Sequence, residues 1–287
     1  MQDNNIARAI SLTTLAMLAF AANSVLCRLA LADSTIDAAS FTAVRTLSGA
    51  IILLVLFSFS AQARKTPAPF KPRIFQIISL IGYMVFFSFA YNTLAAGTGA
   101  LILFGAVQIT MFMIALKQGE HFPPLAWAGL VLAIGGLVYL VSPGLSAPDP
   151  VGAVLMAIAG VSWGVYSLLG RGTGNPLQST MSNFLYAAPV TILLVLIMME
   201  DLHVTPFGMI MAILSGALAS GCGYAIWYAA LKGLTASRAA TVQLTVPAIA
   251  AIGGAFLLSE DITFRLAIAG IVTLGGVGIV LSQKMKA

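Results

Sequence analysis

The sequence predicts an all-α polytopic membrane protein, in which ten transmembrane helices form two inverted five-helix repeats around a central cavity. Three observations support this fold class: the composition, the number of apolar segments and an internal repeat. Of the 287 residues, 60% are hydrophobic and 8% are charged, and the mean hydropathy is +1.00. Soluble domains carry about 25% charged residues, so this balance excludes a soluble protein.

Ten apolar segments remain when the chain is cut at charges, prolines and polar clusters. Each is close to the roughly 20 residues that cross a bilayer as a helix. The longest polar interval between them, Ala61 to Arg73, is too short for a soluble domain. The expected spans are Arg8–Leu31, Ala38–Phe59, Arg73–Ala95, Thr98–Leu116, Leu125–Ser142, Val151–Gly170, Ser179–Met199, Phe207–Leu231, Ala236–Leu258 and Phe264–Ser282.

The basic residues predict the orientation, because cytoplasmic loops of membrane proteins carry an excess of lysine and arginine. With a cytoplasmic N-terminus, only Arg28, Arg45 and Arg265 of the 14 basic residues fall on the outer side or at outer helix ends. The others fall inside: Arg8, Arg64, Lys65, Lys71, Arg73, Lys117, Arg171, Lys232, Arg238, Lys284 and Lys286. We therefore expect a multi-pass protein of the inner (plasma) membrane with both termini in the cytoplasm.

Short motifs recur in the same order in the two halves of the chain. Val107-Gln-Ile-Thr110 in the fourth span matches Val242-Gln-Leu-Thr245 in the ninth, and Tyr91 in the third matches Tyr228 in the eighth. Further matches follow: Glu120 with Glu260, Gly135-Gly136 with Gly275-Gly276, and Ser142 with Ser282. Shared order at a nearly constant spacing indicates a repeat. The sequence predicts one five-helix unit over residues 1–147 and a second over residues 148–287.

An odd number of spans in each half makes the second half enter the membrane from the opposite face. Such inverted-topology repeats are typical of secondary transporters, whose binding sites lie near the bilayer midplane between the repeats, at interrupted helices. A complete pair of repeats in one chain predicts a monomer.

Gln243 and Pro247 mark the interrupted helix. Proline has no amide hydrogen, so Pro247 leaves the carbonyl of Gln243 without its helical partner. Unpaired backbone at membrane depth is tolerated only inside the protein or beside a wet cavity. We predict that Gln243 and its counterpart Gln108 bind substrate and that Pro247 is a gating bend. The alternatives are amides that hold helices together and a simple packing kink.

At this point the chain resembles the drug/metabolite transporter superfamily in its ten-helix EamA-type form. The residues that carry the resemblance are Tyr228–Leu231, Ala236-Ser-Arg-Ala, Pro247, Ser259-Glu260, Gly270 through Gly278, the weaker first-half copy and Arg45. Within the superfamily the chain is most similar to YddG-type exporters of aromatic amino acids. The resemblance implies ten helices around a central cavity, both termini inside and export of small metabolites.

Aromatic residues at helical spacing are candidates for the cavity wall. Trp163 and Tyr166 share one face of the sixth span, and Tyr224 and Trp227 share one face of the eighth. Tyr91 and Tyr83 on the third span and Tyr186 on the seventh are further candidates. The alternative is an aromatic belt at the membrane interface.

Two polar groups inside the spans complete the expected substrate-binding set. Arg45 lies about eight residues into the second span, and an ionisable residue at that depth is by default a functional hypothesis. It is a candidate partner for a substrate carboxylate; the alternatives are snorkelling to the outer surface and pairing with Asp37 or Asp33. Asn23, in the first span, is a candidate cavity amide, with helix packing as the alternative.

The sequence predicts no enzyme, no catalytic residue, no metal site and no cofactor. The two histidines lie in loops and neither cysteine has a second one near it, so no metal cluster is expected. There is no phosphate-binding loop and no acidic residue inside any span, so nucleotide hydrolysis and a carboxylate proton relay are not expected. The predicted partners are a small-molecule substrate and the lipid bilayer, not nucleic acid.

The function that the sequence predicts is export of small metabolites, above all aromatic or other neutral amino acids, by alternating access. The two halves would rock about a cavity lined by the first, third, fourth, sixth, eighth and ninth spans. One alternative is an exporter of drugs or other metabolites. A passive channel would need a continuous polar stripe, and a membrane enzyme would need a nucleophile, an acid–base pair or a metal at membrane depth.

The substrate-binding role of Gln243 predicts that Gln243→Ala weakens transport. The variant removes an amide from the expected site, so affinity or rate for a neutral amino acid should fall in liposomes that contain the purified protein. A folded variant with unchanged transport and affinity would refute this role.

Overall fold

A computed structural model describes residues 2–60, 73–119, 121–144, 146–170, 175–231 and 242–283, with the side chains described from residue 10 onward. Eight helices in these ranges are long and apolar enough to cross a membrane, and two shorter apolar helices of 17 and 13 residues complete the set. The predicted all-α polytopic fold with ten spans is confirmed.

The helices follow the expected spans in order. The first half contains α1 (Gln2–Leu31), α2 (Ala38–Ser58), α3 (Ile74–Ala90), α4 (Ala96–Lys117) and α5 (Pro124–Val141). The second half contains α6 (Pro150–Gly170), α7 (Pro176–Ile197), a short 3₁₀ turn (Met199–Asp201), α8 (Pro206–Leu214), a π-helical segment (Ser215–Cys222), α9 (Gly223–Leu231), α11 (Val246–Leu258) and α12 (Phe264–Ser282). Together α8, the π-helical segment and α9 form the eighth span.

Local sequence signals fix where several helices begin. Asp37 accepts a hydrogen bond from the amide of Ser40 at the start of α2. The side chains of Asn175, Thr205 and Thr263 do the same for α7, α8 and α12. Each satisfies an amide that has no partner inside the helix. Proline occupies the first turn of α5, α7 and α8, where its missing amide hydrogen costs nothing.

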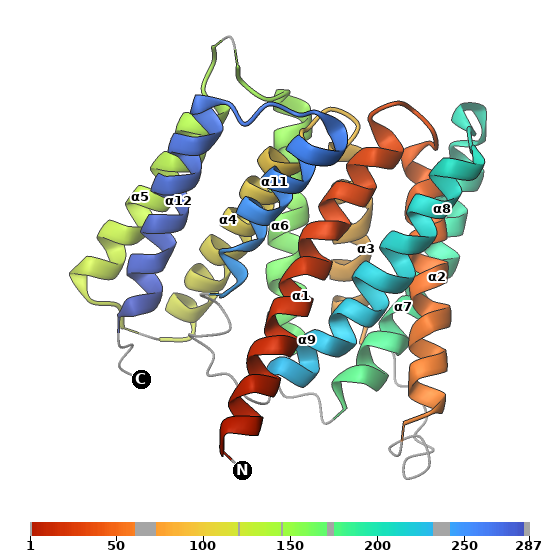
Figure 1. The fold of residues 1–287 in the computed structure, drawn as a ribbon, viewed down its shortest axis with the longest axis horizontal. Coiled ribbons are helices and arrows are strands. Elements are labelled where there is room, and N and C mark those ends of the chain that lie inside the picture. Colours follow the sequence, from red (N-terminus) through yellow and green to blue (C-terminus); the bar gives the residue numbers. More distant parts are fainter. Residues whose placement is uncertain are drawn as a thin grey trace.

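The packing of the two halves is symmetric. Equivalent helices pair across the molecule: α2 with α7, α4 with α11 and α5 with α12. The remaining contacts also exchange, since α1 packs on the eighth span as α6 packs on α3, and α1 packs on α11 as α6 packs on α4. Because the most extensive contacts all have counterparts, the arrangement is that of two inverted repeats. The start of α1 and the end of α12 lie at the same end of the bundle (Figure 1).

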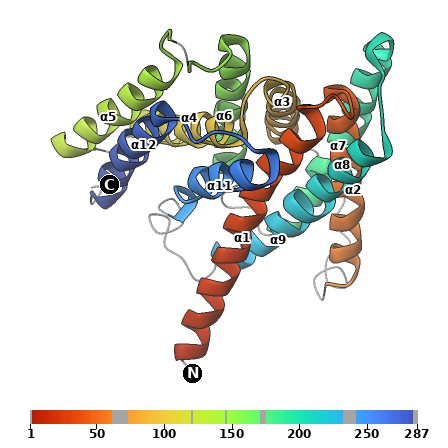
Figure 2. The same ribbon diagram turned by 45° about the horizontal axis from the view of Figure 1, so that its top comes forward.

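The pair α5 and α12 lies at one edge of the bundle in both views (Figure 2). Its two helices approach closely through glycines. A Cβ on Gly129 would lie 2.6 Å from the carbonyl oxygen of Gly276, and a Cβ on Gly276 would lie 2.5 Å from the carbonyl oxygen of Gly129. Small residues at such positions let backbones pack without side chains between them.

A second close approach joins α2 to the π-helical segment. A Cβ on Gly216 would collide with the hydroxyl of Ser48 and with the carbonyl oxygen of Arg45, and a Cβ on Gly221 would collide with the side chain of Ile52. π-helical turns inside helices occur frequently at functional sites. Here the segment packs directly against the backbone of α2 at Arg45.

The ninth span differs from the expected one. Residues 244–245 form a turn, α11 begins at Val246, and Pro247 is buried in its first turn. The helix is therefore interrupted just before Pro247, where a proline is tolerated. Residues 236–241 of the predicted span lie outside the described residues. The counterpart α4 runs unbroken for 22 residues, longer than the predicted Thr98–Leu116.

Two other predicted boundaries are wrong at their ends. The third span ends at Ala90 rather than Ala95, because Tyr91, Asn92 and Thr93 form hydrogen-bonded turns between α3 and α4. The seventh span begins at Pro176, three residues earlier than predicted, because Asn175 caps it. Neither difference changes the number of spans.

The close contact at Gly216 makes a prediction about stability. Gly216→Ala would force α2 away from the π-helical segment, so the purified protein in detergent should unfold at a temperature several degrees lower, as expected for overpacking that costs about 1–3 kcal/mol. Gly275→Ala is the matched control, because nothing lies within 4 Å of a Cβ at Gly275. Equal melting temperatures for the two variants would contradict the packing described here.

Candidate functional site

A small cavity lies between the two halves. Its volume is about 20 Å³, room for a single water molecule. It is bounded by α1, α3 and α4 of the first half and by α6, the π-helical segment and α9 of the second. The lining side chains are Phe20, Asn23, Ser24, Tyr83, Phe87, Leu103, Phe104, Trp163, Ala219 and Tyr224.

Trp163 is the centre of an aromatic cluster around this cavity. Its ring centroid lies 4.8 Å from that of Tyr83 and 5.0 Å from that of Tyr224. Tyr166 stacks on it at 5.4 Å and Phe20 meets it edge-on at 6.4 Å. These distances are within the range at which aromatic pairs stabilise each other. The cluster presents flat apolar faces to the cavity.

A chain of hydrogen bonds meets the aromatic cluster at Tyr83. Arg45, with none of its surface exposed, donates from Nη2 to the hydroxyl of Tyr83 at 2.9 Å and from Nε to that of Ser220 at 3.3 Å. Asn23 donates to the same Tyr83 hydroxyl at 3.1 Å and accepts from the hydroxyl of Ser215 at 2.6 Å. The chain thus connects α1, α2, α3 and the π-helical segment.

Three buried polar atoms near the cavity have no hydrogen-bond partner among the described residues. They are Nη1 of Arg45, the hydroxyl of Tyr224 and Nε2 of Gln108. Tyr224 lines the cavity, and Gln108 lies one helical turn beyond the lining residue Phe104. Buried polar atoms are nearly always paired, so unpaired ones need an explanation such as a water molecule or a ligand.

Three of the predicted site residues line the cavity: Trp163, Tyr224 and Asn23. Tyr166 and Trp227 are buried one layer behind it, Tyr166 against Trp163 and Trp227 against Phe20, with centroids 5.8 Å apart in the second pair. The structure therefore gathers these five side chains in one region between the halves.

The two glutamines do not line this cavity. Gln243 is buried, with 8% of its surface exposed, and precedes the turn that starts α11. Gln108 is buried in the unbroken helix α4. No described residue of α11 is among the lining residues, although the ninth span was expected to contribute.

Tyr91 has a local partner. It is fully buried at the end of α3, its hydroxyl donates to the carbonyl of Ala96 at 3.2 Å, and its ring packs edge-on against Phe87. It does not line the cavity. Tyr186, by contrast, is 41% exposed on α7 and faces away from the bundle interior.

Arg45 does not snorkel, and it pairs with no acid among the described residues, so the structure supports neither of the alternatives considered for it. Its guanidinium is fully buried, and the carboxylate of Asp37 instead accepts from the amides of Ser40 and His203. The close approach of α2 to Gly216 keeps Arg45 inside the bundle, where its side chain cannot reach the surface.

Sequence reasoning missed much of the cavity wall. Phe20, Ser24, Phe87, Leu103, Phe104 and Ala219 were not among the candidates, and Tyr83 was only a secondary one. A signal was present: Phe20, Asn23 and Ser24 have the i, i+3, i+4 spacing that puts a polar pair on one helix face. Phe87 follows Tyr83 by one turn in the same way.

An ion pair closes the end of the bundle that holds the α1–α2 loop, the upper end in Figure 1. Arg28 contacts Glu260 with 2.9 Å between Nε and Oε1, and its Nη1 donates to the carbonyls of Tyr91 and Asn92 at 3.0 Å. Glu260 also accepts from the amide of Ala96 at 2.8 Å. This pair ties α1 and the α3–α4 turn to the end of α11.

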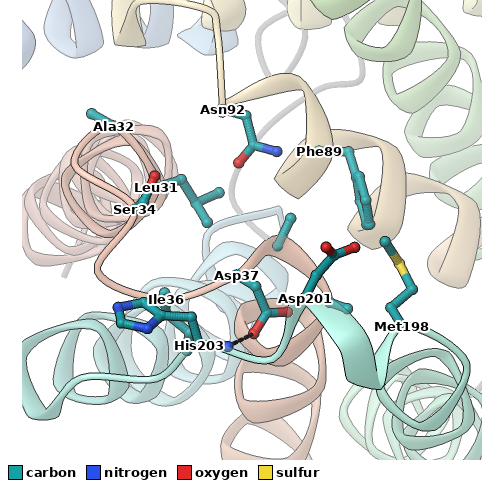
Figure 3. Close-up of a pocket in the computed structure, with 12 residues that line it drawn as sticks. Leu31, Ala32, Ser34, Ile36, Asp37, Phe89, Asn92, Met198, Asp201 and His203 are labelled. Atoms are coloured by element: carbon teal, nitrogen blue, oxygen red, sulfur yellow. Dashed lines mark hydrogen bonds between the residues drawn. The ribbon is translucent and has the colours of Figure 1, made fainter.

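A larger pocket opens at the same end of the bundle. Its volume is about 440 Å³, and it lies between the α1–α2 loop, the end of α3 and the chain that joins α7 to α8. Figure 3 shows Asn92 on one side and Asp201 and His203 on the other, with the bond from the His203 amide to Asp37. The pocket is separate from the cavity, since the two share no lining residue.

The family comparison matches almost the whole chain. A model of the EamA-like transporter family matches residues 7–142 and again residues 150–282. An uncharacterized protein of Pseudomonas aeruginosa is 49% identical over 97% of this chain and 96% of its own length. The threonine/homoserine exporter RhtA of Escherichia coli is 26% identical over 88% of this chain and 84% of its own.

A solved crystal structure has the same fold. It superposes with a TM-score of 0.66 over 93% of this chain and 98% of its own, at 19% sequence identity. At this identity the likeness extends to the arrangement of the helices only.

Proposed function

The chain belongs to the EamA-like transporter family, and we propose that it exports neutral amino acids, aromatic ones among them, across the inner membrane. The family places it among transporters, and the relatives named as threonine/homoserine exporters point to amino acids as the substrate class. The observation that carries the proposal is the cavity between the halves, which combines aromatic faces with a buried hydrogen-bonding chain.

The cavity lining offers contacts to both parts of an amino acid. Trp163, Tyr224 and Phe20 offer flat apolar surface to a side chain. Asn23 and the groups that it contacts offer donors and acceptors to the polar end. Sites for small molecules commonly combine apolar walls with a few placed polar groups.

The proposed mechanism is alternating access. The cavity holds no more than a water molecule in this conformation, so the halves must separate to admit a substrate. The Arg28–Glu260 ion pair joins the halves at one end, which the distribution of basic residues makes the outer end. The break before Pro247 lets α11 move without its preceding segment. In this orientation the opposite end of the bundle, which holds the start of α1 and the end of α12, faces the cytoplasm (Figure 1).

Export of drugs or other metabolites is the second candidate function. It is favoured by the aromatic rings around the cavity, since flat apolar molecules of many kinds stack on such faces. A panel of substrates separates the two candidates.

The first prediction concerns substrate choice. Liposomes that contain the purified protein should take up phenylalanine and threonine saturably, and common aromatic drugs should compete poorly. Trp163→Ala should weaken affinity for phenylalanine by roughly 3- to 10-fold, the equivalent of one aromatic contact, and affect threonine less. Trp127→Ala is the control, because Trp127 is 41% exposed on α5 and outside the cavity. Strong drug uptake without amino acid uptake would favour the second candidate.

The second prediction concerns the ion pair. Glu260→Gln removes one charge from a partly buried pair, and a loss of about 1 kcal/mol would raise the outward-open population about fivefold. In a protein with Cys27 and Cys222 replaced, a cysteine at the lining position Ser24 should then react faster with a membrane-impermeant maleimide added from outside.

Asp261→Asn is the matched control for this experiment. Asp261 is the next acid along the chain, is exposed, and forms no ion pair within the described residues. Equal labelling rates for Glu260→Gln, Asp261→Asn and the parent would show that the ion pair does not hold the outer end closed.

A further inference from the structure

We propose that Arg45 is a carboxylate subsite, so that the transported amino acid is recognised through its α-carboxylate; this inference rests on the proposed function. The starting observation is the depth of the charge. Arg45 lies two turns into α2 (Ala38–Ser58), and none of its surface is exposed. A buried guanidinium is costly unless a counter-charge and hydrogen bonds compensate for the lost water.

The protein supplies no such counter-charge. Every contact that Arg45 makes among the described residues is neutral: two hydroxyls, from Tyr83 and Ser220, and the rings of Tyr83 and Phe87. The nine acidic residues all lie outside the apolar spans or at their ends. The partly buried Arg28, which pairs with Glu260, shows the ion pair that Arg45 lacks.

One donor group of Arg45 is also unused. Nε and Nη2 have hydroxyl partners, but Nη1 has none within the described part of the chain. Nη1 and Nη2 together form the fork that binds a carboxylate through two parallel hydrogen bonds. A substrate carboxylate would satisfy Nη1 and supply the missing negative charge in one step.

The position of Arg45 relative to the cavity makes this contact reachable. Its guanidinium carbon is 5.1 Å from the ring centroid of Tyr83 and 4.8 Å from that of Phe87, and both rings line the cavity. Arg45 is therefore one side chain behind the wall. When the halves separate, rotation of these two rings would expose the guanidinium to a bound ligand.

The same geometry predicts what the site rejects. The ammonium group of an amino acid can lie against the aromatic faces of Tyr83, Trp163 or Tyr224, or donate a hydrogen bond to the side-chain oxygen of Asn23. A molecule with an ammonium group but no carboxylate would bring a second positive charge next to Arg45. We therefore expect selection for zwitterions and carboxylates over amines and amides.

The test compares a carboxylate with its amide in the same assay. The readout is transport of labelled phenylalanine by the wild-type protein in liposomes. Unlabelled phenylalanine and phenylalaninamide are added as competitors. The variants are Arg45→Gln, which removes the charge, and Arg45→Lys, which keeps a point charge without the fork. Arg265→Gln is the control, because Arg265 lies in the first turn of α12 and binds the carbonyls of Leu140, Ser142 and Pro143 at the end of α5.

We expect the wild type and Arg265→Gln to prefer phenylalanine over its amide by at least about tenfold. Arg45→Gln should lose about 30-fold or more in affinity for phenylalanine, as is typical when a charged partner is removed, while its affinity for the amide changes less than about threefold. Arg45→Lys should retain part of the preference.

Two results would overturn the proposal: a wild type without preference for the carboxylate, or an Arg45→Gln variant that loses both compounds equally. If Arg45→Gln does not fold, Arg45→Lys is the deciding variant, because lysine lacks the two-pronged guanidinium. An unchanged ratio of the affinities for phenylalanine and phenylalaninamide in Arg45→Lys would count against a carboxylate subsite. Absence of amino acid transport in the wild type would instead refute the proposed function.

Discussion

The burial of one positive charge in an apolar bundle is the constraint on which much of the structure depends. Arg45 cannot reach water, so its surroundings must satisfy it. The glycine at position 216 lets the π-helical segment approach the backbone of Arg45, and Ser220, one turn later, accepts from its side chain. Tyr83 accepts from the same guanidinium and from Asn23, which brings α3 and α1 into the network. A single charged residue thus links four elements, three of them in the first half of the chain and one in the second.

The inverted repeat explains where the cavity lies, and departures from symmetry indicate where the molecule can move. The most extensive contacts between the two halves have counterparts, so both halves contribute to the space between them. The fourth and ninth spans break this rule, because α4 is continuous and the ninth span is interrupted before α11. The eighth span contains a π-helical segment, whereas its counterpart α3 is α-helical throughout. Both irregular elements belong to the second half, and helices with weakened backbone bonding bend more readily.

The sequence was sufficient to predict the features that depend on composition and periodicity. Ten spans and their order follow from apolar length, and the stacking of Tyr166 on Trp163 follows from helical spacing within α6. Contacts between residues far apart in the chain were not predictable in the same way. Arg28 and Glu260 are separated by 232 positions, and no sequence pattern gave a reason to pair them: Arg28 stood as a basic residue at the outer side and Glu260 as the match of Glu120. The burial of Arg45 depends on a glycine in another helix, which no pattern within α2 reveals. Gln243 was expected at the cavity because Pro247 interrupts its helix. The structure does show an interruption, at the turn of residues 244–245, but Gln243 does not line the cavity.

The ion pair and the cavity are connected through α1 and α3, and this connection gives a physical route from binding to opening. α1 carries Asn23 at the cavity and Arg28 at the ion pair, little more than one turn apart. α3 carries Tyr83 and Phe87 at the cavity and ends at Tyr91, whose carbonyl accepts from Arg28. A ligand that displaces the rings of Tyr83 and Phe87 must move the same two helices that hold Arg28 against Glu260. Because packed helices shift as rigid units rather than deform residue by residue, a ligand large enough to widen a cavity of about 20 Å³ also strains the ion pair. In the proposed mechanism, occupation of the cavity and release of the Arg28–Glu260 ion pair are therefore coupled through α1 and α3.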